Sequence, residues 1–158
     1  MIKLRELTEN DAIYMLEWMH DPSIQKFFRK NMLKYTLDDA KEFCINSDVP
    51  SVIKDGCDVH YAIANEDNEY LGTISLKNID LESRSAEYAI AMRKKAQGYG
   101  NAYMASVMLL KKAFSEYKLH RVYLNVLANN NKAIKLYEKI GFSCEGEFRD
   151  HIKKRMCT

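Results

Sequence analysis

The sequence predicts an α+β fold in which a mixed, mostly antiparallel central sheet is flanked by helices. Two strand-like runs, residues 59–64 and 70–76, are separated by the polar turn 65–69, a pattern typical of a hairpin. After a third strand-like run at 86–92, helical and strand-like segments alternate. This alternation predicts one parallel strand pair joined by a right-handed crossover helix. The 158 residues, 47% of them hydrophobic, suit a single domain with its own core.

The first third of the chain is predicted to be mostly helical. A short alternating strand at residues 2–7 precedes Thr8, which opens a capping box for a helix that runs through Trp18. Pro22 occupies a favoured first position of a short helical turn. Thr36 begins another helix, which is expected to end near position 45 before a loop.

Two helices and two strands are predicted in the second half. The helix 101–117 and the helix 131–140 each carry apolar residues at helical period, and a strand at 122–127 separates them. A last strand is expected within 142–151. The chain stops soon afterwards, so this strand is expected to be short, or its hairpin partner missing, with a frayed tail or completion by a second copy in a homodimer. The apolar stripe of the first helix is Tyr103, Val107, Leu110, Phe114 and Tyr117, and that of the second is Ala133, Leu136, Tyr137 and Ile140.

Composition excludes several functional classes. The net charge of +2 is too small to indicate nucleic-acid binding. No apolar run approaches the roughly 20 residues of a membrane helix, and the N-terminus lacks a signal-peptide pattern. The four cysteines are scattered without a Cys-x-x-Cys pair, which argues against a disulfide framework and a zinc site. We therefore expect a cytoplasmic protein without a bound metal.

A glycine-containing segment, Gln97-Gly98-Tyr99-Gly100-Asn101-Ala102, joins a predicted strand to a predicted helix. Glycines let backbone N–H groups approach an anion closely, and the helix dipole adds a favourable field. Residues 93–95, Arg-Lys-Lys, add positive charge just before it. The segment predicts a pyrophosphate site. It is not a dinucleotide fingerprint, because Tyr103 occupies the third glycine position. Taken alone, it could equally be a strand-to-helix turn with solvated lysines.

A second segment favours the pyrophosphate site over a plain turn. Its sequence is Asn130-Asn131-Lys132-Ala133-Ile134-Lys135-Leu136-Tyr137-Glu138-Lys139-Ile140-Gly141-Phe142. In this order and spacing, the two segments resemble the motifs of the Gcn5-related N-acetyltransferase (GNAT) family. Gln97, Gly100 and Ala102 match the pyrophosphate loop of that family, and Asn130, Ala133, Ile134, Tyr137, Glu138, Lys139, Gly141 and Phe142 match its next motif.

The resemblance extends more weakly to residues 4–11, 18–22 and 71–74. They look like the branch that acetylates ribosomal-protein N-termini, polyamines and amino sugars. The resemblance implies a GNAT-like sheet, with the parallel strand–helix–strand unit at the CoA site. It also implies one N-acetyltransferase domain over 1–158: a helical acceptor-site portion (1–57), strands with the pyrophosphate loop (58–100), and a CoA-binding helix, strand, helix and short last strand (101–158).

Acetyl-CoA is the cosubstrate that this resemblance implies. Backbone groups of residues 90–92 would pair with the pantetheine amides like an added strand. Asn130 would bind the pantetheine arm, although it also suits a helix N-cap. Lys132 would meet the 3′-phosphate of CoA, or simply belongs to a solvated helix face. The expected cofactor contacts are Ile90, Ala91, Met92, Gln97, Gly98, Tyr99, Gly100, Asn101, Ala102, Asn125, Asn130, Lys132 and Ala133.

Two residues are candidates for the chemistry. The resemblance places Tyr137 as the general acid that protonates the leaving thiolate, a role that suits a phenol; the alternative is a packed core tyrosine. Glu87 is the best-placed carboxylate for a general base, and an ion pair or a solvated strand face is an equally good interpretation. Ribosomal-peptide acetyltransferases have Glu at the position of Asn125, which cannot accept a proton usefully, so a water-relayed or substrate-deprotonated route stays open.

The sequence therefore predicts an acetyl-CoA-dependent N-acetyltransferase. Its acceptor is a primary amine, either a small molecule or a peptide: an amino sugar, a polyamine or a protein N-terminus. Trp18, Phe27, Phe28 and Arg29 are candidate acceptor contacts, although aromatic residues of this kind are more often core. Two alternatives remain: a non-catalytic acyl-CoA-binding or regulatory module of the same fold, and a nucleic-acid-binding domain that uses residues 93–95. The near-neutral net charge opposes the second alternative, and we expect no nucleic-acid or membrane partner.

Overall fold

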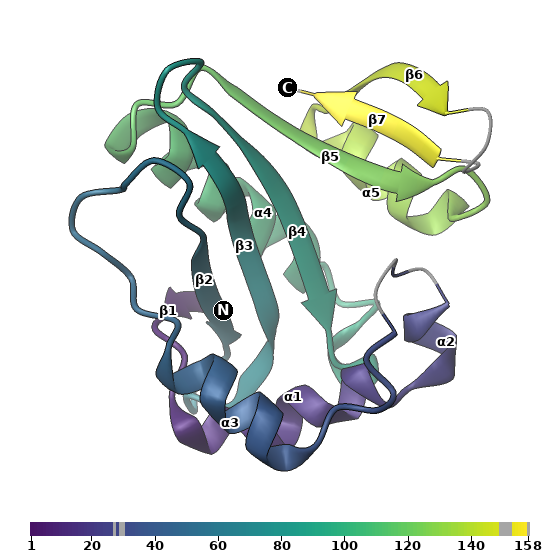
Figure 1. The fold of residues 1–158 in the computed structure, drawn as a ribbon. Helices are drawn as coiled ribbons and strands as arrows, with labels where there is room; N and C mark the ends of the chain where they lie inside the picture. The colour runs from purple at the N-terminus through teal and green to yellow at the C-terminus, as the bar shows by residue number, and fades with distance from the viewer. Residues whose placement is uncertain (27, 29–30, 149–152, 158) are drawn as a thin grey trace.

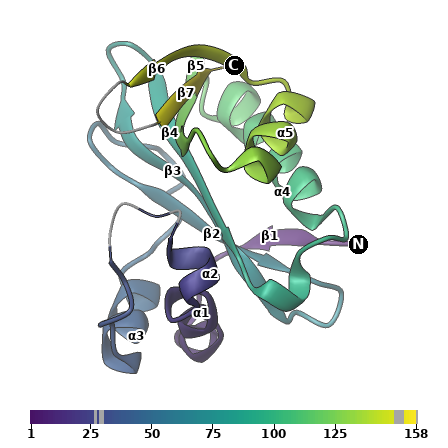
Figure 2. The ribbon, with the colours of Figure 1, turned by 90° about the vertical axis from the view of Figure 1, so that its right-hand side faces the viewer.

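The computed structural model describes residues 1–26, 28, 31–148 and 153–157. Within them, a seven-stranded mixed sheet runs through the molecule in the order β1-β2-β3-β4-β5-β7-β6 (Figure 1). Helices α1, α2 and α3 cover one face of the sheet, and α4 and α5 cover the other (Figure 2). The predicted fold class is confirmed, because every strand pair except β4–β5 is antiparallel.

The first face is covered by short helices whose ends are defined by local hydrogen bonds. Strand β1 (Lys3–Arg5) leads through the 3₁₀ turn η1 (Glu9–Asp11) into α1 (Ala12–Met19), α2 (Pro22–Gln25) and α3 (Leu37–Ile45). The helix predicted to begin at Thr36 starts with a capping box: the N–H of Thr36 donates to Asp39 Oδ2 at 2.8 Å, and its Oγ1 accepts from Asp39 N–H at 3.2 Å.

The middle of the chain forms the antiparallel meander that the sequence predicts. Strand β2 (Val59–Ala64) pairs with β3 (Tyr70–Asp80), and β3 pairs with β4 (Ser85–Met92). The β3–β4 register shifts between Lys77 and Asp80. Asn78, with φ of 51°, lies in this irregularity, which bends the end of β3 and ends its regular pairing.

The parallel pair is short. Strand β5 (Arg121–Leu127) follows the crossover helix α4 (Asn101–Lys111) and the π-helical turn η3 (Lys112–Glu116). It pairs with β4 only through Ser85–Arg121, Ala86–Val122 and Glu87–Tyr123. Beyond these pairs the two strands separate, so that a gap opens between their ribbons (Figure 1).

The C-terminal hairpin differs from the prediction. After α5 (Asn131–Ile140), strand β6 (Ser143–Phe148) occupies part of the expected last strand, and β7 (Lys153–Cys157) follows. The expectation of a missing partner strand is wrong, because β7 lies between β5 and β6 and pairs with both. Its sequence, Lys-Lys-Arg-Met-Cys, has no apolar alternation. The strand exists because backbone pairing on both edges overrides the weak local pattern.

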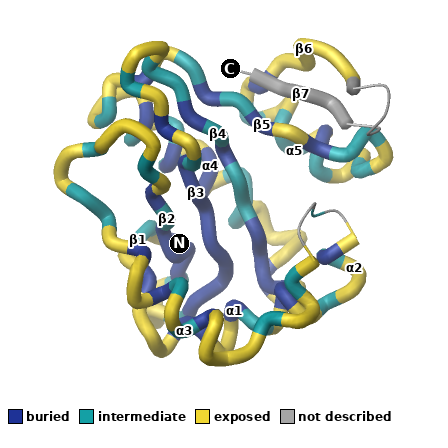
Figure 3. The backbone as a smooth tube through the Cα atoms, in the orientation of Figure 1, coloured by how far each residue is buried: buried dark blue, intermediate teal, exposed yellow. Residues whose placement is uncertain are grey.

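The predicted apolar stripe of the long helix is only partly right, because Leu110 and Tyr117 pack against the core but two other members do not. Val107 and Phe114 are 44% and 36% exposed. The face that packs on the sheet consists instead of Ala105, Ser106, Leu109 and Ala113. Small side chains let the helix approach the sheet closely, so the larger residues on neighbouring faces stay partly in solvent. Figure 3 shows how burial concentrates along β3 and β4 at the centre of the sheet.

Gly72 is required by the close approach of β3 and β4. A Cβ built on Gly72 would lie 2.4 Å from the carbonyl oxygen of Ala91 and 2.8 Å from Sδ of Met92. We expect Gly72→Ala to lower the free energy of unfolding by about 2 kcal/mol, because the added methyl group overpacks the two strands. Thermal and urea unfolding would measure this.

Gly146 in β6 supplies the matched control, because a Cβ built there meets no atom of the described residues within 4 Å. Gly146→Ala should change the free energy of unfolding by less than about 1 kcal/mol. Equal losses for both variants would show that contact with β4 is not the reason for glycine at position 72.

Candidate active site

A cavity of about 720 Å³ occupies the place where β4 and β5 separate. Its walls come from β4, the loop that follows β4, the start of α4, β5 and α5, together with parts of β3, of α2 and of the segment after α2. Most of the residues predicted from sequence line it. They are Phe28, Glu87, Ile90, Ala91, Met92, Gln97, Gly98, Gly100, Asn101, Ala102, Asn125, Asn130, Lys132, Ala133 and Tyr137.

The loop after β4 is shaped by internal hydrogen bonds. Gln97 Nε2 donates to the carbonyl of Met92 at 3.3 Å, and Asn101 Nδ2 donates to the carbonyl of Ala96 at 3.2 Å. Gly98 and Gly100 have φ of 88° and 78°, a left-handed conformation that glycine adopts without strain. The first N–H groups of α4 consequently face a concave, anion-attracting end of the cavity. Tyr99 is 77% exposed and does not line the cavity.

The edge of β4 that faces the cavity is open. Ile90 and Met92 pair with β3 on the other edge, but the β4–β5 pairs end at Glu87. Backbone donors and acceptors of residues 88–92 on the open edge therefore have no strand partner in the described part of the chain. Such an edge can bind an extended, amide-containing chain in the manner of an added strand.

Tyr137 is held by an aromatic cluster. Its ring lies 5.7 Å from that of Tyr88 and 6.1 Å from that of Phe142, both edge to face. Tyr88 is fixed in turn by a 2.5 Å hydrogen bond to Ser106. Burial raises the pKa of Tyr137 to about 12, so the hydroxyl is a proton donor at neutral pH. The Tyr137 hydroxyl has no hydrogen-bond partner among the described residues, which leaves it free to act on a ligand.

Asn130 has the N-cap role that the sequence left open. Its Oδ1 accepts from the N–H of Ala133 at 3.3 Å, at the first turn of α5. The residue also lines the cavity. Lys132, on the same turn, is exposed and lines the cavity mouth. The start of α5 thus brings a donor-rich turn and a positive charge to the cavity.

Glu87 is oriented by two amides from the neighbouring strands. Asn78 Nδ2 donates to its Oε1 at 3.2 Å, and Asn125 Nδ2 donates to its Oε2 at 3.4 Å. Glu87 lies at the last β4–β5 pair, half-buried on the cavity wall. Asn125 therefore acts here as a hydrogen-bond donor to the only carboxylate among the described residues that line the cavity.

The predicted acceptor contacts near the N-terminus occupy different positions relative to the cavity. Phe28 lines the cavity. Trp18 lies behind it: the indole is 6% exposed, stacks on Phe28 at 5.7 Å and donates to the hydroxyl of Tyr70 at 2.9 Å. Trp18 thus supports the cavity wall from the core. Phe27 and Arg29 lie outside the described residues. Sequence reasoning missed Ser23, Ile24, Met32, Lys77, Tyr88 and Leu124, which also line the cavity.

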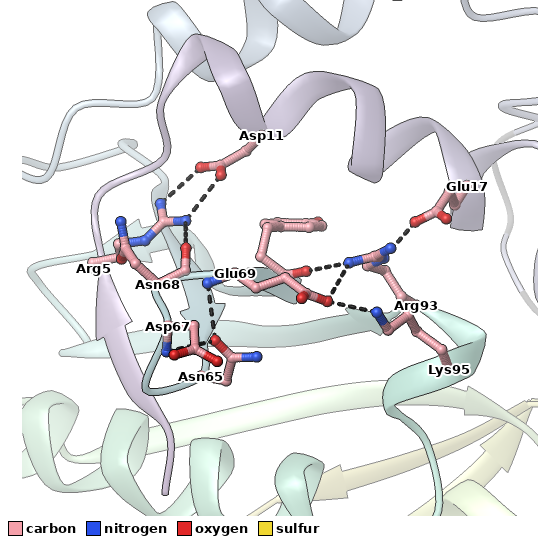
Figure 4. Close-up of polar contacts among 10 residues, drawn as sticks. Arg5, Asp11, Glu17, Asn65, Asp67, Asn68, Glu69, Arg93 and Lys95 are labelled. Carbon is pink, nitrogen blue, oxygen red and sulfur yellow. Dashed lines mark hydrogen bonds and ion pairs between the residues drawn. The ribbon is translucent and has the colours of Figure 1, made fainter.

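Arg93 is the first residue after β4, and its side chain ties this end of the strand to α1 and to the start of β3 (Figure 4). The guanidinium is buried and forms ion pairs with Glu17 of α1 and with Glu69, the latter at 3.1 Å. It also donates to the carbonyl of Tyr70 at 2.8 Å. The hydrogen bond from Lys95, together with the charge of Arg93, lowers the pKa of Glu69. This network fixes the start of the loop to α1 and β3.

Metal-binding groups and membrane-spanning helices are both absent from the described part of the chain. No group of three or more His, Cys, Asp or Glu side chains there could hold a metal ion. No helix in that part is long and apolar enough to span a bilayer.

Comparison with known proteins shows the family. The acetyltransferase (GNAT) domain model matches residues 2–143. The chain is 29% identical over 147 residues to the spermidine N(1)-acetyltransferase of Escherichia coli (strain K12), covering 92% of this chain and 75% of that protein. It is 37% identical over 86 residues to a putative ribosomal N-acetyltransferase, YdaF, of Bacillus subtilis (strain 168), covering 54% and 47% of the two. The crystal structure of the Vibrio cholerae spermidine N-acetyltransferase with CoA and spermine matches at 25% identity and a TM-score of 0.86, over 99% and 94% of the two chains.

This chain therefore belongs to the GNAT family, as the two motifs predicted, and is an N-acetyltransferase. The fold class, the transferase activity and the dependence of the family on acetyl-CoA agree with the sequence-based predictions.

The Arg93 network yields a prediction. Arg93→Met removes the cation shared by Glu17 and Glu69. We expect a loss of about 2 kcal/mol in the free energy of unfolding, less than for a fully buried pair because both carboxylates are partly exposed. We also expect weaker acetyl-CoA binding, measured by calorimetry, because the loop start loses its anchor.

Lys95→Met is the matched control, since Lys95 binds the same oxygen of Glu69 at 2.7 Å but is 60% exposed. It should lower stability by less than about 0.5 kcal/mol. Similar losses in the two variants would contradict the anchoring role of Arg93.

Proposed function

We propose that this chain transfers the acetyl group of acetyl-CoA to a primary amine by direct attack of the amine on the thioester, with Tyr137 as the general acid. The observation that carries the proposal is the Tyr137 hydroxyl, which is protonated, without a hydrogen-bond partner among the described residues, and on the wall of the cavity beside the open edge of β4. A thiolate leaving at that position would receive its proton from the phenol.

The cavity suits acetyl-CoA at both of its ends. The loop 97–102 and the start of α4 would hold the pyrophosphate through backbone N–H groups. The open edge at residues 90–92 would pair with the pantetheine amides, and a backbone N–H there would stabilise the oxyanion. Lys132 on α5 would meet the 3′-phosphate. Asn130, Ala133 and Asn125 complete the proposed contacts from α5 and β5.

The amine must lose a proton before it attacks, since alkylammonium groups have a pKa of about 10. Glu87 is the base that the geometry favours. Its carboxylate lies on the cavity wall and is held by Asn78 and Asn125, without an ion pair to any described residue. The two amides orient the carboxylate by hydrogen bonds but carry no charge that would pair with it. We therefore propose that it accepts the proton of the amine, directly or through water.

The proposed division of labour follows the layers of the fold. Residues 1–57 would shape the acceptor side, 58–100 would supply the central strands and the pyrophosphate loop, and 101–158 would bind CoA. Amino sugars, polyamines and peptide N-termini are the acceptor classes to test. Spermidine is included because two of the similar proteins described above are named for it. A homodimer stays a prediction.

Tyr137→Phe tests the proposal directly. Removal of the hydroxyl alone should lower kcat about 100-fold, the usual contribution of a general acid, and leave the dissociation constant of acetyl-CoA within about twofold. Thiol release with a panel of amines gives the rate, and calorimetry gives the binding.

Tyr14→Phe is the control, because Tyr14 lies on α1, is 42% exposed and does not line the cavity. It should keep full activity. CoA binding with no turnover of any amine by the wild type would favour the non-catalytic acyl-CoA-binding module instead. Normal turnover by Tyr137→Phe would remove the general acid from the mechanism.

The pH dependence separates a buried donor from an ordinary tyrosine. Because burial raises the pKa of Tyr137 to about 12, its hydroxyl stays protonated at pH values where an unperturbed tyrosine, with a pKa of about 10, is half ionised. The ratio of wild-type to Tyr137→Phe rates should therefore stay constant from about pH 7 to about pH 10. A ratio that falls by half near pH 10 would contradict the raised pKa.

A further inference from the structure

We infer that the acceptor amine carries a negatively charged group, a phosphate or a carboxylate, which pairs with Lys77. This inference rests on the proposed function and narrows its substrate class. The first observation is the charge on the cavity wall. Among the described residues that line the cavity there is one carboxylate, Glu87, against four lysines. These are Lys77, Lys94, Lys132 and Lys139.

Lys77 stands apart from the other three lysines. Lys132 and Lys139 lie on α5, and Lys94 lies in the turn after β4, at the end proposed for the CoA phosphates. Lys77 is on β3, directly opposite Glu87 in the β3–β4 register. Glu87 lies five residues before the end of β4. Lys77, opposite Glu87, therefore lies about 17 Å along the strand from the end proposed to bind the phosphates. CoA phosphates bound there would not account for its charge.

The face of the sheet to which Lys77 projects also indicates a contact with the acceptor and not with CoA. Directly opposed residues in an antiparallel pair project to the same face, so Lys77 and Glu87 share one face of the sheet. Alternation along β4 puts Ala91 on that face as well, and Ala91 packs in the cluster formed with α1 and α3. Tyr88 and Met92 belong to the cluster on the opposite face, with α4 and α5. Lys77 therefore faces the side proposed for the acceptor.

Lys77 has no carboxylate partner in the described part of the chain. The oxygens of Glu87 accept from Asn78 and Asn125. The nearby Asp58 accepts the backbone N–H of Asn78 at 2.8 Å and lies 4.0 Å from His60 Nε2. A half-buried lysine on a cavity wall, without a carboxylate partner among the described residues, is poorly compensated, and an anionic ligand would supply the missing partner.

The same arrangement disfavours a polycation. A polyamine needs carboxylates around each of its charged nitrogens, and like charges placed together are repulsive. Among the described residues, a single carboxylate would face the attacking amine, and Lys77 would repel the next ammonium group. An amine with a phosphate or carboxylate a few ångströms from the nitrogen would instead place its amine at Glu87 and its anion at Lys77, since opposed Cβ atoms lie about 5 Å apart.

The test compares matched acceptors. Glucosamine-6-phosphate and glucosamine differ by a phosphate, γ-aminobutyrate and butylamine by a carboxylate, and spermidine represents the polycations. We expect at least one anionic amine to exceed its neutral match by about tenfold or more in kcat/KM, the size of one charge-assisted contact. The pair that shows the difference identifies phosphate or carboxylate as the recognised group. Spermidine should be the poorest acceptor.

Lys77→Gln should remove the preference by raising KM for the anionic amine about tenfold, so that its kcat/KM falls to about that of the neutral match. Lys111→Gln, an exposed lysine on α4 outside the cavity, removes the same charge and should keep the preference. Preference for spermidine, or an equal effect of Lys77→Gln on charged and neutral amines, would overturn the inference while leaving the transferase intact. If no amine is acetylated, binding of the same pairs to the CoA complex of wild type and Lys77→Gln, by calorimetry, still decides the role of Lys77.

Discussion

The separation of β4 from β5 after the Glu87–Tyr123 pair is the feature on which the rest of the site depends. A continuous ladder would satisfy the backbone groups of residues 88–92 and leave no room for a ligand. Strand β5 is kept in place past this point because β7 pairs with its other edge, from Tyr123 to Leu127. The C-terminal hairpin, the least expected part of the fold, therefore maintains the gap, and the cavity and the open edge of β4 follow from it.

One strand serves both proposed substrates because side chains alternate along it. Glu87 and Ala91 project to the side of α1 and α3, and Tyr88 and Met92 to the side of α4 and α5. The acceptor and the cofactor can thus approach the same short segment from opposite faces and meet at the gap. Gly72 and Arg93 fix the position of this segment. The missing Cβ of Gly72 lets β3 approach Ala91, and the ion pairs of the buried Arg93 anchor the end of β4.

Much of this could be predicted from sequence, for reasons that differ between elements. The loop at Gly98 and Gly100 and the segment around Tyr137 carry local signals, glycines with left-handed φ and a helix with a capped start, and both line the cavity. The stripe predicted for the long helix was only partly right, because small residues such as Ala105 pack closest while Val107 stays exposed. Strand β7 and Lys77 depend on long-range pairing, which local patterns do not encode.

Two cations on β3 and at the end of β4 show how the surroundings decide a role. Arg93 is buried, and its charge is compensated by ion pairs with Glu17 and Glu69 and by a hydrogen bond to the carbonyl of Tyr70. Lys77 is less buried, borders the cavity and has no carboxylate of the described chain to neutralise it. A charge that the protein compensates internally stabilises the fold, and one left uncompensated on a cavity wall selects what enters. By this criterion, the proposed acceptor, an amine with an anionic group that pairs with Lys77, differs from a polyamine.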